Sequence, residues 1–418
     1  MKKTLLTICL VWMCFSLSAQ KIIDLSGKWS FSIDRQDNGE KEKWFSHTLN
    51  DFINLPGSMP EKLKGDEVTA KTQWTGSLYD SSYYYNPYME KYRKEGNIKF
   101  PFFLTPDKHY VGAAWYQKEV NIPADWKGER ILLFLERPHI ETTVWVNGQK
   151  TGMQNSLCVP HQYDITRYVR PGKCTITIRV DNRIKEINVG PDSHSITDQT
   201  QGNWNGIVGR ICLQTTPKTY FDDIQIYPEP EQKLARVKVV IKGTGTAKVK
   251  LSAESFNTDK KHIVPAIQQE IKLNKGVTET EMVLPMGNDM LLWDEFHPAL
   301  YKLKAEVTNG KKTEIKEIQF GMRRFEIKGK WFYVNGRKTQ LRGTVENCDF
   351  PLTGYAPMDV ESWERVFRIC RNYGLNHMRF HSFCPPEAAF MAADRVGFYL
   401  QPEGPSWPNH GPKLGLGQ

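Results

Sequence analysis

The stretch Leu375–Gln401, LNHMRFHSFCPPEAAFMAADRVGFYLQ, contains one complete strand–helix–strand unit. Its first six residues are typical of a strand, Pro386 opens a helical run, and Gly397 is placed to end that helix. A second strand follows at Phe398–Gln401. Because strands joined through a helix usually lie parallel in one sheet, this stretch predicts an α/β fold for the C-terminal part of the chain.

The segment before this unit repeats the pattern from residue 323 onward. Lys338–Arg342 is a predicted strand that ends at Gly343, and Asp359 can cap a helix that ends at Gly374. The apolar positions of that helix are Val360, Trp363, Val366, Phe367, Cys370 and Tyr373. A complete α/β (TIM) barrel takes about 250 residues. The alternation of strands and helices over residues 323–418 predicts a parallel sheet, and the family resemblance described below implies that this sheet is the first three βα units of such a barrel.

Two β-rich blocks precede the α/β part, so the chain is predicted to be multidomain. Residues 20–218 contain many short strand-like runs, and Asn147-Gly148 after Thr142–Val146 is a strong hairpin signal. This block predicts a sandwich or a jelly roll, and the family resemblance described below implies the jelly roll. Residues 219–322 predict an immunoglobulin-like β-sandwich of roughly seven short strands. Its strand-like runs are Val237–Ile241, Ala247–Ala253, Thr278–Leu284 and Leu300–Val307.

The N-terminus has the pattern of a secretory signal peptide. Lys2 and Lys3 precede a mostly apolar stretch, Leu5–Leu17, and the small residues Ser18 and Ala19 follow it. We expect cleavage of residues 1–19 and export to the periplasm or the extracellular space. No long apolar run occurs after residue 19, which argues against a membrane span.

Composition excludes several other classes of protein. Of the 418 residues, 39% are hydrophobic and 25% charged, which is typical of a folded protein. The formal net charge is +9, but the basic residues are interspersed with acids, so a nucleic-acid partner is not expected. Six of the eight cysteines lie after residue 19 and are widely spaced. They predict buried free thiols rather than a disulfide scaffold, and any pairing stays open.

Polar side chains follow each of the three predicted parallel strands. Glu346 and Asp349 follow the first strand, Arg379 and His381 end the second, and Glu403 follows the third. Ser382 and Trp407 belong to the same junctions. In a parallel α/β barrel these junctions form the active-site face. Carboxylates and guanidinium groups bind hydroxyl groups, and indole rings pack on C–H surfaces, so this mixture suits a sugar.

These features together resemble glycoside hydrolase family 2, the β-galactosidases, β-glucuronidases and β-mannosidases. The order of jelly roll, immunoglobulin-like domain and barrel is similar to that of the family. The motifs that carry the resemblance are Trp115-Tyr116, Trp145–Gly148, Trp204–Ile207, Trp293 with Pro298, Leu300 and Tyr301, Phe332–Gly336 with Leu341–Gly343, and Asp394–Gly397 with Glu403. They span nearly the whole chain after residue 19.

Two motifs depart from the family pattern. The family usually has Asn-x-His where this chain has Val345-Glu346-Asn347, and Arg-x-Ser-His-Tyr-Pro where this chain has Arg379–Cys384. Both departures lie in the expected sugar site. The chain therefore resembles a divergent branch of the family rather than a plain β-galactosidase or β-glucuronidase.

The resemblance implies an exo-acting, retaining β-glycosidase that hydrolyses terminal β-linked sugars from glycans. Such enzymes use two carboxylates about 5 Å apart, an acid/base and a nucleophile. The resemblance places them after the fourth and seventh barrel strands, beyond Gln418. We therefore assign no catalytic residue within the chain and expect the chain alone to be inactive. Neither a cofactor nor a metal is implied, the partner is a β-linked oligosaccharide, and the oligomeric state is open.

Each substrate-binding candidate also has a structural interpretation. Arg379 can steady a catalytic carboxylate and His381 can meet a sugar hydroxyl, or both can belong to a polar structural layer. Glu346 and Asp349 can bind hydroxyls or cap their loop, and Glu403 can orient a neighbour instead of touching sugar. For the other candidates, Asn203 and Trp204 can extend a loop to the sugar or form a turn with a buried indole, and Tyr83–Tyr85 with Tyr88 favour packing over a sugar platform.

Two rival functions come from other classes of protein. The chain could be a carbohydrate-binding remnant without catalysis, or a structural β-sandwich protein. Sugar binding by residues 20–218 alone would favour the first.

Overall fold

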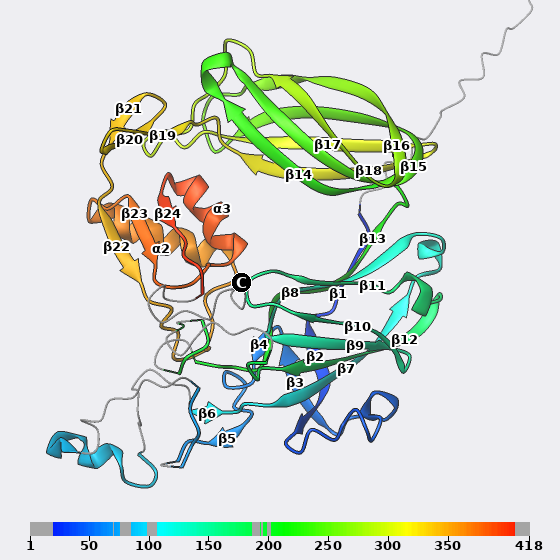
Figure 1. Ribbon diagram of the computed structural model, residues 1–418, viewed down its shortest axis with the longest axis vertical. Coiled ribbons are helices and arrows are strands. Elements are labelled where there is room, and N and C mark those ends of the chain that lie inside the picture. The colour runs from blue at the N-terminus through cyan, green and yellow to red at the C-terminus, as the bar shows by residue number, and fades with distance from the viewer. Residues whose placement is uncertain are drawn as a thin grey trace, which may run out of the picture.

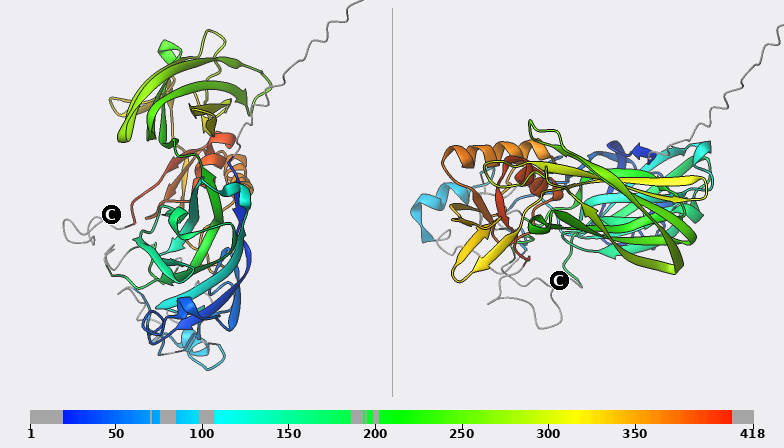
Figure 2. Two further views of the ribbon diagram at one scale, coloured as in Figure 1. Left: turned by 90° about the vertical axis from the view of Figure 1, so that its right-hand side faces the viewer. Right: turned by 90° about the horizontal axis from the view of Figure 1, so that it is seen from above.

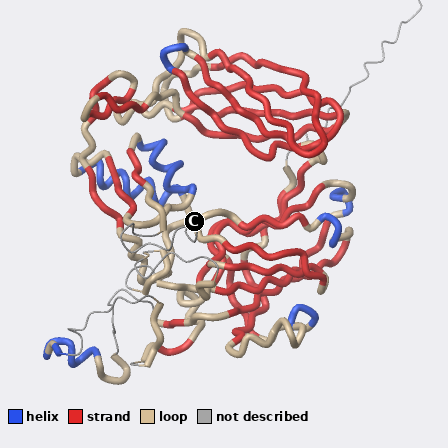
Figure 3. The backbone as a smooth tube through the Cα atoms, viewed as in Figure 1, coloured by secondary structure: helices blue, strands red, loops and turns tan. Residues whose placement is uncertain are grey.

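The computed structural model describes residues 20–69, 71–75, 85–97, 107–185, 193, 195–198 and 202–405. The predicted signal peptide, Tyr83, Tyr84 and Trp407 lie outside the described residues. Figure 1 shows three parts: a jelly-roll domain below, an immunoglobulin-like domain above, and a C-terminal α/β unit beside them. Figure 3 shows strands throughout the first two parts, with the two long helices in the third.

The jelly-roll domain consists of two antiparallel sheets that enclose a core of large apolar side chains such as Trp29, Tyr116 and Leu133. One sheet has the order β1-β13-β8-β11 with β4 on β13, and the other has the order β10-β9-β12-β7-β2-β3. The bounds are β1 Ile22–Asp24, β2 Gly27–Asp34, β3 Asp51–Leu55, β4 Gly57–Ser58, β7 Ala113–Ile122, β8 Arg130–His139, β9 Glu141–Val146, β10 Gln149–Asn155, β11 His161–Asp164, β12 Gly172–Asp181 and β13 Gly206–Thr216. The predicted hairpin is confirmed, since Asn147 (φ 50°) and Gly148 (φ 76°) join β9 to β10.

The jelly-roll domain also contains short strands and 3-10 helices outside its two sheets. They are β5 Asp66–Glu67, β6 Lys108–His109, and the 3-10 helices η1 Trp44–Ser46, η2 Pro87–Tyr92, η3 Ala124–Trp126 and η4 Thr166–Tyr168. Tyr85, two residues before η2, and Tyr88, within it, are 82% and 84% exposed. The packing role favoured for the tyrosine cluster is therefore wrong for these two side chains.

The immunoglobulin-like domain has fewer and longer strands than predicted. They are β14 Tyr220–Glu229, β15 Leu234–Phe256, β16 Ile263–Pro285, β17 Leu300–Asn309 and β18 Lys312–Phe320, with the 3-10 helix η5 Pro230–Gln232 after β14. The runs Val237–Ile241 and Ala247–Ala253 belong to one strand, β15, whose pairing with β16 shifts register between Gly243 and Gly245. This irregularity lets the strand change its second partner from β14 to β17 without a turn, so the expected seven short strands were wrong.

The C-terminal part begins with an antiparallel hairpin sheet and continues into a parallel one. The hairpin sheet comprises β19 Phe325–Lys328, β20 Trp331–Val334 and β21 Arg337–Thr339. The α/β unit comprises β22 Gly343–Glu346, α2 Val360–Asn372, β23 His377–Phe380, α3 Glu387–Val396 and β24 Tyr399–Gln401. Strands β22, β23 and β24 pair in parallel, as predicted. In the core of the α/β unit, Trp363 of α2 packs against Phe380, and Phe367 of α2 packs against Phe398.

The predicted strand Lys338–Arg342 is wrong, although the predicted helices are confirmed. Asn376 donates to the Gln340 carbonyl (3.1 Å) and accepts from the Arg342 amide (2.7 Å). The Asn376 side chain thus bonds to the backbone of residues 340 and 342, which link β21 to β22 and belong to neither strand. The carboxylate of Asp359 caps α2 by accepting from the Ser362 amide at 2.7 Å. Gly374 and Gly397 follow the two helices with φ of 78° and 76°.

The α/β unit is fastened to both other domains (Figure 2). Tyr355 donates to Glu61 of the jelly-roll domain at 2.9 Å, and Arg210 of that domain pairs with Glu387 at 2.8 Å. On the other side, Trp293 Nε1 donates to the Asp394 carbonyl at 2.7 Å. Two of the sequence motifs, around Trp204 and Trp293, therefore lie at contacts between domains.

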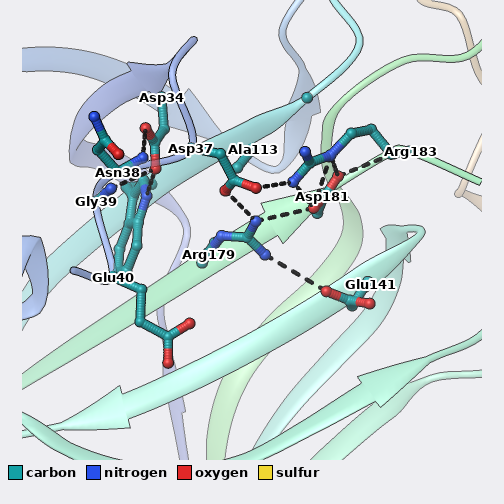
Figure 4. A network of polar contacts seen from close by, with 12 residues as sticks. Asp34, Asp37, Asn38, Gly39, Glu40, Ala113, Glu141, Arg179, Asp181 and Arg183 are labelled. Atoms are coloured by element: carbon teal, nitrogen blue, oxygen red, sulfur yellow. Dashed lines mark hydrogen bonds and ion pairs between the residues drawn. The ribbon is translucent and has the colours of Figure 1, made fainter. Parts of the chain in front are cut away.

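A partly buried ionic network holds the segment after β2 against the jelly-roll sheet (Figure 4). Arg179 of β12, whose side chain is 8% exposed, contacts Asp37 at 2.6 Å, Asp181 at 2.9 Å and Glu141 at 3.5 Å. Arg183 contacts Asp37 and Asp181, each at 2.6 Å. Because each charge has a partner of opposite sign, the network is compensated despite its burial.

Candidate functional site

The parallel sheet brings the ends of three strands to one edge. Val345 pairs in register with Arg379, and Arg379 with Gln401. Glu346 ends β22 one residue after Val345, and Glu403 follows Gln401 by two residues, so both lie at the same edge as Arg379. This arrangement is the one that the alternation of strands and helices predicted. Contact of these side chains with a substrate stays a prediction.

Arg379 and Glu403 form a two-point ion pair. Arg379 Nε lies 2.5 Å from Glu403 Oε1, and Nη2 lies 3.2 Å from Oε2. The side chains are 39% and 24% exposed, so the pair is open to solvent on one side. The planar fork of the guanidinium fixes its orientation against the carboxylate. Glu403 thus holds the guanidinium of Arg379 in place, which fits its interpretation as an orienting residue. The expected contact of Arg379 with a catalytic carboxylate stays a prediction.

Glu346 accepts hydrogen bonds within the loop after β22, and its carboxyl group has a raised pKa. Its two carboxylate oxygens accept from the amide of Cys348 at 3.1 and 3.0 Å. Burial raises the pKa of Glu346 to about 7; these amide bonds oppose the shift, and the negative charge of Asp349 adds to it. Near neutral pH this carboxyl group is present in both protonation states, so it can donate or accept a hydrogen bond.

His381 and Asp349 complete the edge. The backbone amide of His381 donates to the Glu346 carbonyl at 2.9 Å, which ties the end of β23 to the end of β22. The His381 ring Nδ1 lies 3.4 Å from Asn347 Oδ1. His381 and Asp349 are both half-buried. The five candidates from the α/β unit therefore all lie at or just after the ends of neighbouring parallel strands, and the side chains of Arg379 and Glu403 contact each other there.

Asn203 and Trp204 lie in the jelly-roll domain, and both are 3% exposed. The Asn203 amide group donates to the Asn182 carbonyl at 2.8 Å and to Thr75 Oγ1 at 3.2 Å. The Trp204 ring stacks on His139 with centroids 4.6 Å apart. The structure thus gives both residues the packing role that was the alternative, and their expected sugar contact finds no support in this geometry.

Sequence reasoning missed Arg137 and Tyr355, which hold the loops of the site against the jelly-roll domain. Arg137, near the end of β8, donates from Nη1 and Nη2 to the Cys384 carbonyl, each at 3.3 Å. The Tyr355 ring lies 5.6 Å from that of Trp204. The available signal was the change from the apolar run Ile131–Leu135 to charged residues at the end of one strand.

Three further features of the described residues concern metal binding, membrane spans and clefts. Within the described ranges no three His, Cys, Asp or Glu side chains are grouped to hold a metal ion. None of the helices in this part of the chain has the length and apolar character needed to cross a membrane. A cleft of about 920 Å³ between the domains is lined by Glu136, Arg210 and Glu387 among others, and does not include Glu346, Arg379 or Glu403.

Comparison with known proteins identifies both β domains. Residues 22–217 match the model of the glycosyl hydrolases family 2 sugar binding domain, and residues 219–323 match a second model of glycosyl hydrolases family 2. A β-galactosidase from Thermoanaerobacter pseudethanolicus is 24% identical over 334 residues, which cover 75% of this chain. The β-glucuronidase of Homo sapiens is 23% identical over 420 residues, which cover 91% of this chain.

Solved structures share the fold. A β-glucuronidase from Ruminococcus gnavus superposes with a TM-score of 0.68 at 20% identity, covering 92% of this chain and 60% of that one. A family 2 member from Bacteroides cellulosilyticus gives a TM-score of 0.64 at 20% identity, covering 91% and 47%. The chain spans 42% of the Thermoanaerobacter enzyme and 57% of the human one, about half of each. With two successive family models matched from residue 22 to residue 323, the chain belongs to glycoside hydrolase family 2.

Proposed function

We propose that this chain is the N-terminal portion of an exported, retaining exo-β-glycosidase that removes terminal β-linked sugars from glycans. The observation that carries the proposal is the group of Glu346, Arg379 and Glu403 at one edge of a parallel sheet that is docked on two family 2 domains. Relatives named β-galactosidase and β-glucuronidase support the same reaction class.

In this proposal residues 323–418 are the first three βα units of a TIM barrel. The acid/base and the nucleophile are supplied by residues beyond Gln418, after the fourth and seventh strands. Double displacement needs both carboxylates, so the 418-residue chain by itself hydrolyses no glycoside. The match covers only 42% and 57% of two of the relatives, which supports this division.

The residues of this chain would bind the terminal sugar. Arg379, held by Glu403, offers its remaining N–H groups to sugar oxygens, since a guanidinium has five donors and Glu403 accepts from two nitrogens. Glu346, with a pKa of about 7, can donate to one hydroxyl and accept from another. His381 and Asp349 lie at the same edge and would bind further hydroxyls. Their role is to orient the sugar for catalytic groups elsewhere.

The first test is to sequence the source DNA past codon 418. We expect an open frame that encodes an Asn-Glu motif and further βα units. The protein from that frame should hydrolyse a nitrophenyl β-galactoside or β-glucuronide, whereas the 418-residue chain should not. A stop codon after codon 418 would overturn the proposal, and sugar binding without hydrolysis would then favour a carbohydrate-binding protein.

Variants of the longer protein test the assigned site. Arg379→Met should lower kcat/KM by at least about tenfold, the equivalent of one charge-assisted hydrogen bond. Arg368→Met is the matched control, because Arg368 lies on the exposed face of α2 with 61% of its side chain accessible. If both variants had equal kcat/KM, Arg379 would not be part of the sugar-binding site.

Export forms a separate part of the proposal. Expression with residues 1–19 in a bacterial host that exports proteins should give a mature protein that starts at Gln20. Recovery of a cell-associated protein that still begins at Met1 would argue against it.

A further inference from the structure

Three of the six described cysteines lie where the jelly-roll domain meets the α/β unit. Cys158 belongs to the segment between β10 and β11, Cys348 follows β22, and Cys384 precedes α3. All six described cysteines are free thiols in this structure. The other three are Cys174 on β12, Cys212 on β13 and Cys370 on α2.

Two of the three interface cysteines are held by one guanidinium group. Arg137 Nη2 donates to the carbonyl of Cys158 at 3.4 Å and to that of Cys384 at 3.3 Å. Burial raises the thiol pKa of Cys158, and the charge of Arg137 and a hydrogen bond from the Cys384 backbone oppose that rise. Cys158 and Cys384 both line one small void of about 20 Å³, together with Phe383 and Trp204. Two backbones that come from different domains are thus fixed beside each other.

We propose that Cys158 and Cys384 are a site of disulfide formation between the two domains, with a small-molecule disulfide as the oxidant. One cysteine thiolate attacks the oxidant, which gives a mixed disulfide and releases one thiol. The second cysteine then attacks the protein sulfur of the mixed disulfide and releases the second thiol. In total, the two protein thiols lose two protons and two electrons, and the oxidant is reduced to two thiols.

Accessibility selects this pair over the third cysteine. Cys158 and Cys384 are half-buried, whereas Cys348 is 1% exposed inside the core of the α/β unit. Burial raises the thiol pKa of both Cys158 and Cys384, although the charge of Arg137 opposes the shift. Since the thiolate is the attacking form, the reaction should be slow at neutral pH and faster in mildly alkaline solution.

The bond would fasten the loop that carries the end of the candidate site. His381 and Ser382 directly precede this loop, and Ser195 Oγ of the jelly-roll domain already contacts the Ser382 carbonyl at 3.5 Å. A link at Cys384 would hold β23 and its loop against the jelly-roll domain. This inference concerns the chain as it stands and does not depend on the proposed glycosidase activity.

Peptide mapping of the full 418-residue chain tests the proposal. The reduced protein is incubated with glutathione disulfide at mildly alkaline pH, free thiols are alkylated in denaturant, and the digest is analysed by mass spectrometry without reduction. We expect one linked pair of peptides, containing Cys158 and Cys384, that separates on reduction, with Cys174 and Cys348 alkylated. Full alkylation of both cysteines, glutathione adducts only, a link to Cys348, or a disulfide between two chains would overturn the proposal.

Thermal unfolding supplies a second readout. Oxidation should raise the Tm of the wild-type chain and of Cys348→Ser, because the link restricts the unfolded state. It should leave the Tm of Cys158→Ser and of Cys384→Ser unchanged. The wild-type peptide map decides the question even if a variant does not fold, and an equal rise of Tm in all four proteins would contradict the assignment.

Discussion

The ring of Trp204 lies between His139 of its own domain and Tyr355 of the α/β unit, with centroid distances of 4.6 and 5.6 Å. Its Nε1 is buried and has no hydrogen-bond partner among the described residues. A methyl group at Gly354 would lie 3.3 Å from Trp204, so the opposing loop is also closely packed. The indole therefore contributes to the domain contact through its apolar surface.

This contact predicts a graded effect of substitutions at Trp204. Trp204→Ala should lower the free energy of unfolding by about 3–5 kcal/mol, because it leaves a cavity at a closely packed interface. Trp204→Phe should cost clearly less, since a ring is kept and no hydrogen bond is lost. Urea unfolding followed by circular dichroism measures both. Trp331→Ala, at a tryptophan that is 41% exposed, is the control; an equal loss there would show that the interface is not the cause.

The acidity of Glu346 predicts a pH-dependent stability. Its pKa is raised to about 7 in the folded chain, against about 4.3 in an unfolded chain. The folded state therefore binds more protons between these values, and this carboxyl group makes the chain less stable as pH rises through that range. Glu346→Gln should remove the cost of keeping an ionised carboxylate at this buried position. The variant should therefore be more stable than the wild type at pH 8 by about 1 kcal/mol, which is less than the roughly 1.4 kcal/mol that a shift of one pKa unit represents.

The measurement is urea unfolding of both proteins at pH 5 and pH 8. At pH 5 the difference between them should be much smaller, because Glu346 is then mostly protonated in the folded state. A constant difference at both pH values would show that Glu346 does not titrate in this range.

Local signals in the sequence were sufficient for much of the fold. Asp359, Gly374 and Gly397 mark helix ends through their own backbone chemistry, so both helices could be predicted from neighbouring residues. The continuity of β15 could not be predicted, because the polar residues at its centre resemble a turn. The strand continues through this centre because it pairs with β14, β16 and β17. The break between β21 and β22 likewise depends on Asn376, more than thirty residues away.

The same distinction applies to the candidate site. Glu346, Arg379 and Glu403 were predictable because each lies at or just after the end of a parallel strand, and parallel strands end at one edge. The pairing of Arg379 with Glu403 and the burial of Glu346 depend on side-chain packing in three dimensions. Asn203 and Trp204 were expected at the sugar because their motif resembles the family's, but a motif does not show which partner an indole finds.

The N-terminal cap of α2 predicts how two substitutions at Asp359 change the free energy of unfolding. The Asp359 carboxylate accepts from the Ser362 amide at 2.7 Å and from the Ser362 hydroxyl at 2.9 Å. Asp359→Ala should lower the free energy of unfolding by about 1 kcal/mol, whereas Asp359→Asn should cost less, because an amide oxygen still accepts from the backbone. Urea midpoints measure both, and a loss for Asn as large as that for Ala would argue against capping.

The ionic network in Figure 4 predicts how the jelly-roll domain responds to acid. Asp181 has a fully buried side chain and contacts Arg179, Arg183 and Lys185 at 2.9, 2.6 and 2.7 Å. Burial alone would raise the pKa of Asp181, but the hydrogen bonds from Arg183 and Lys185 and the charge of Arg179 outweigh it and hold the pKa well below its usual range. Its contribution to stability is therefore present above pH of about 4 and is lost as pH falls further.

Asp181→Asn should lower the free energy of unfolding at pH 7 by about 3 kcal/mol, because it leaves the buried Arg179 and the partly exposed Arg183 and Lys185 without their shared carboxylate. The loss should shrink as pH falls below about 4, where the wild type begins to lose the same interaction. Asp125→Asn is the matched control, since the Asp125 side chain is 64% exposed and pairs with Lys21 at the surface. Urea unfolding between pH 3 and pH 7 separates the cases: a loss for Asp181→Asn that stays the same over this range would mean that its shape, rather than its charge, holds the network together.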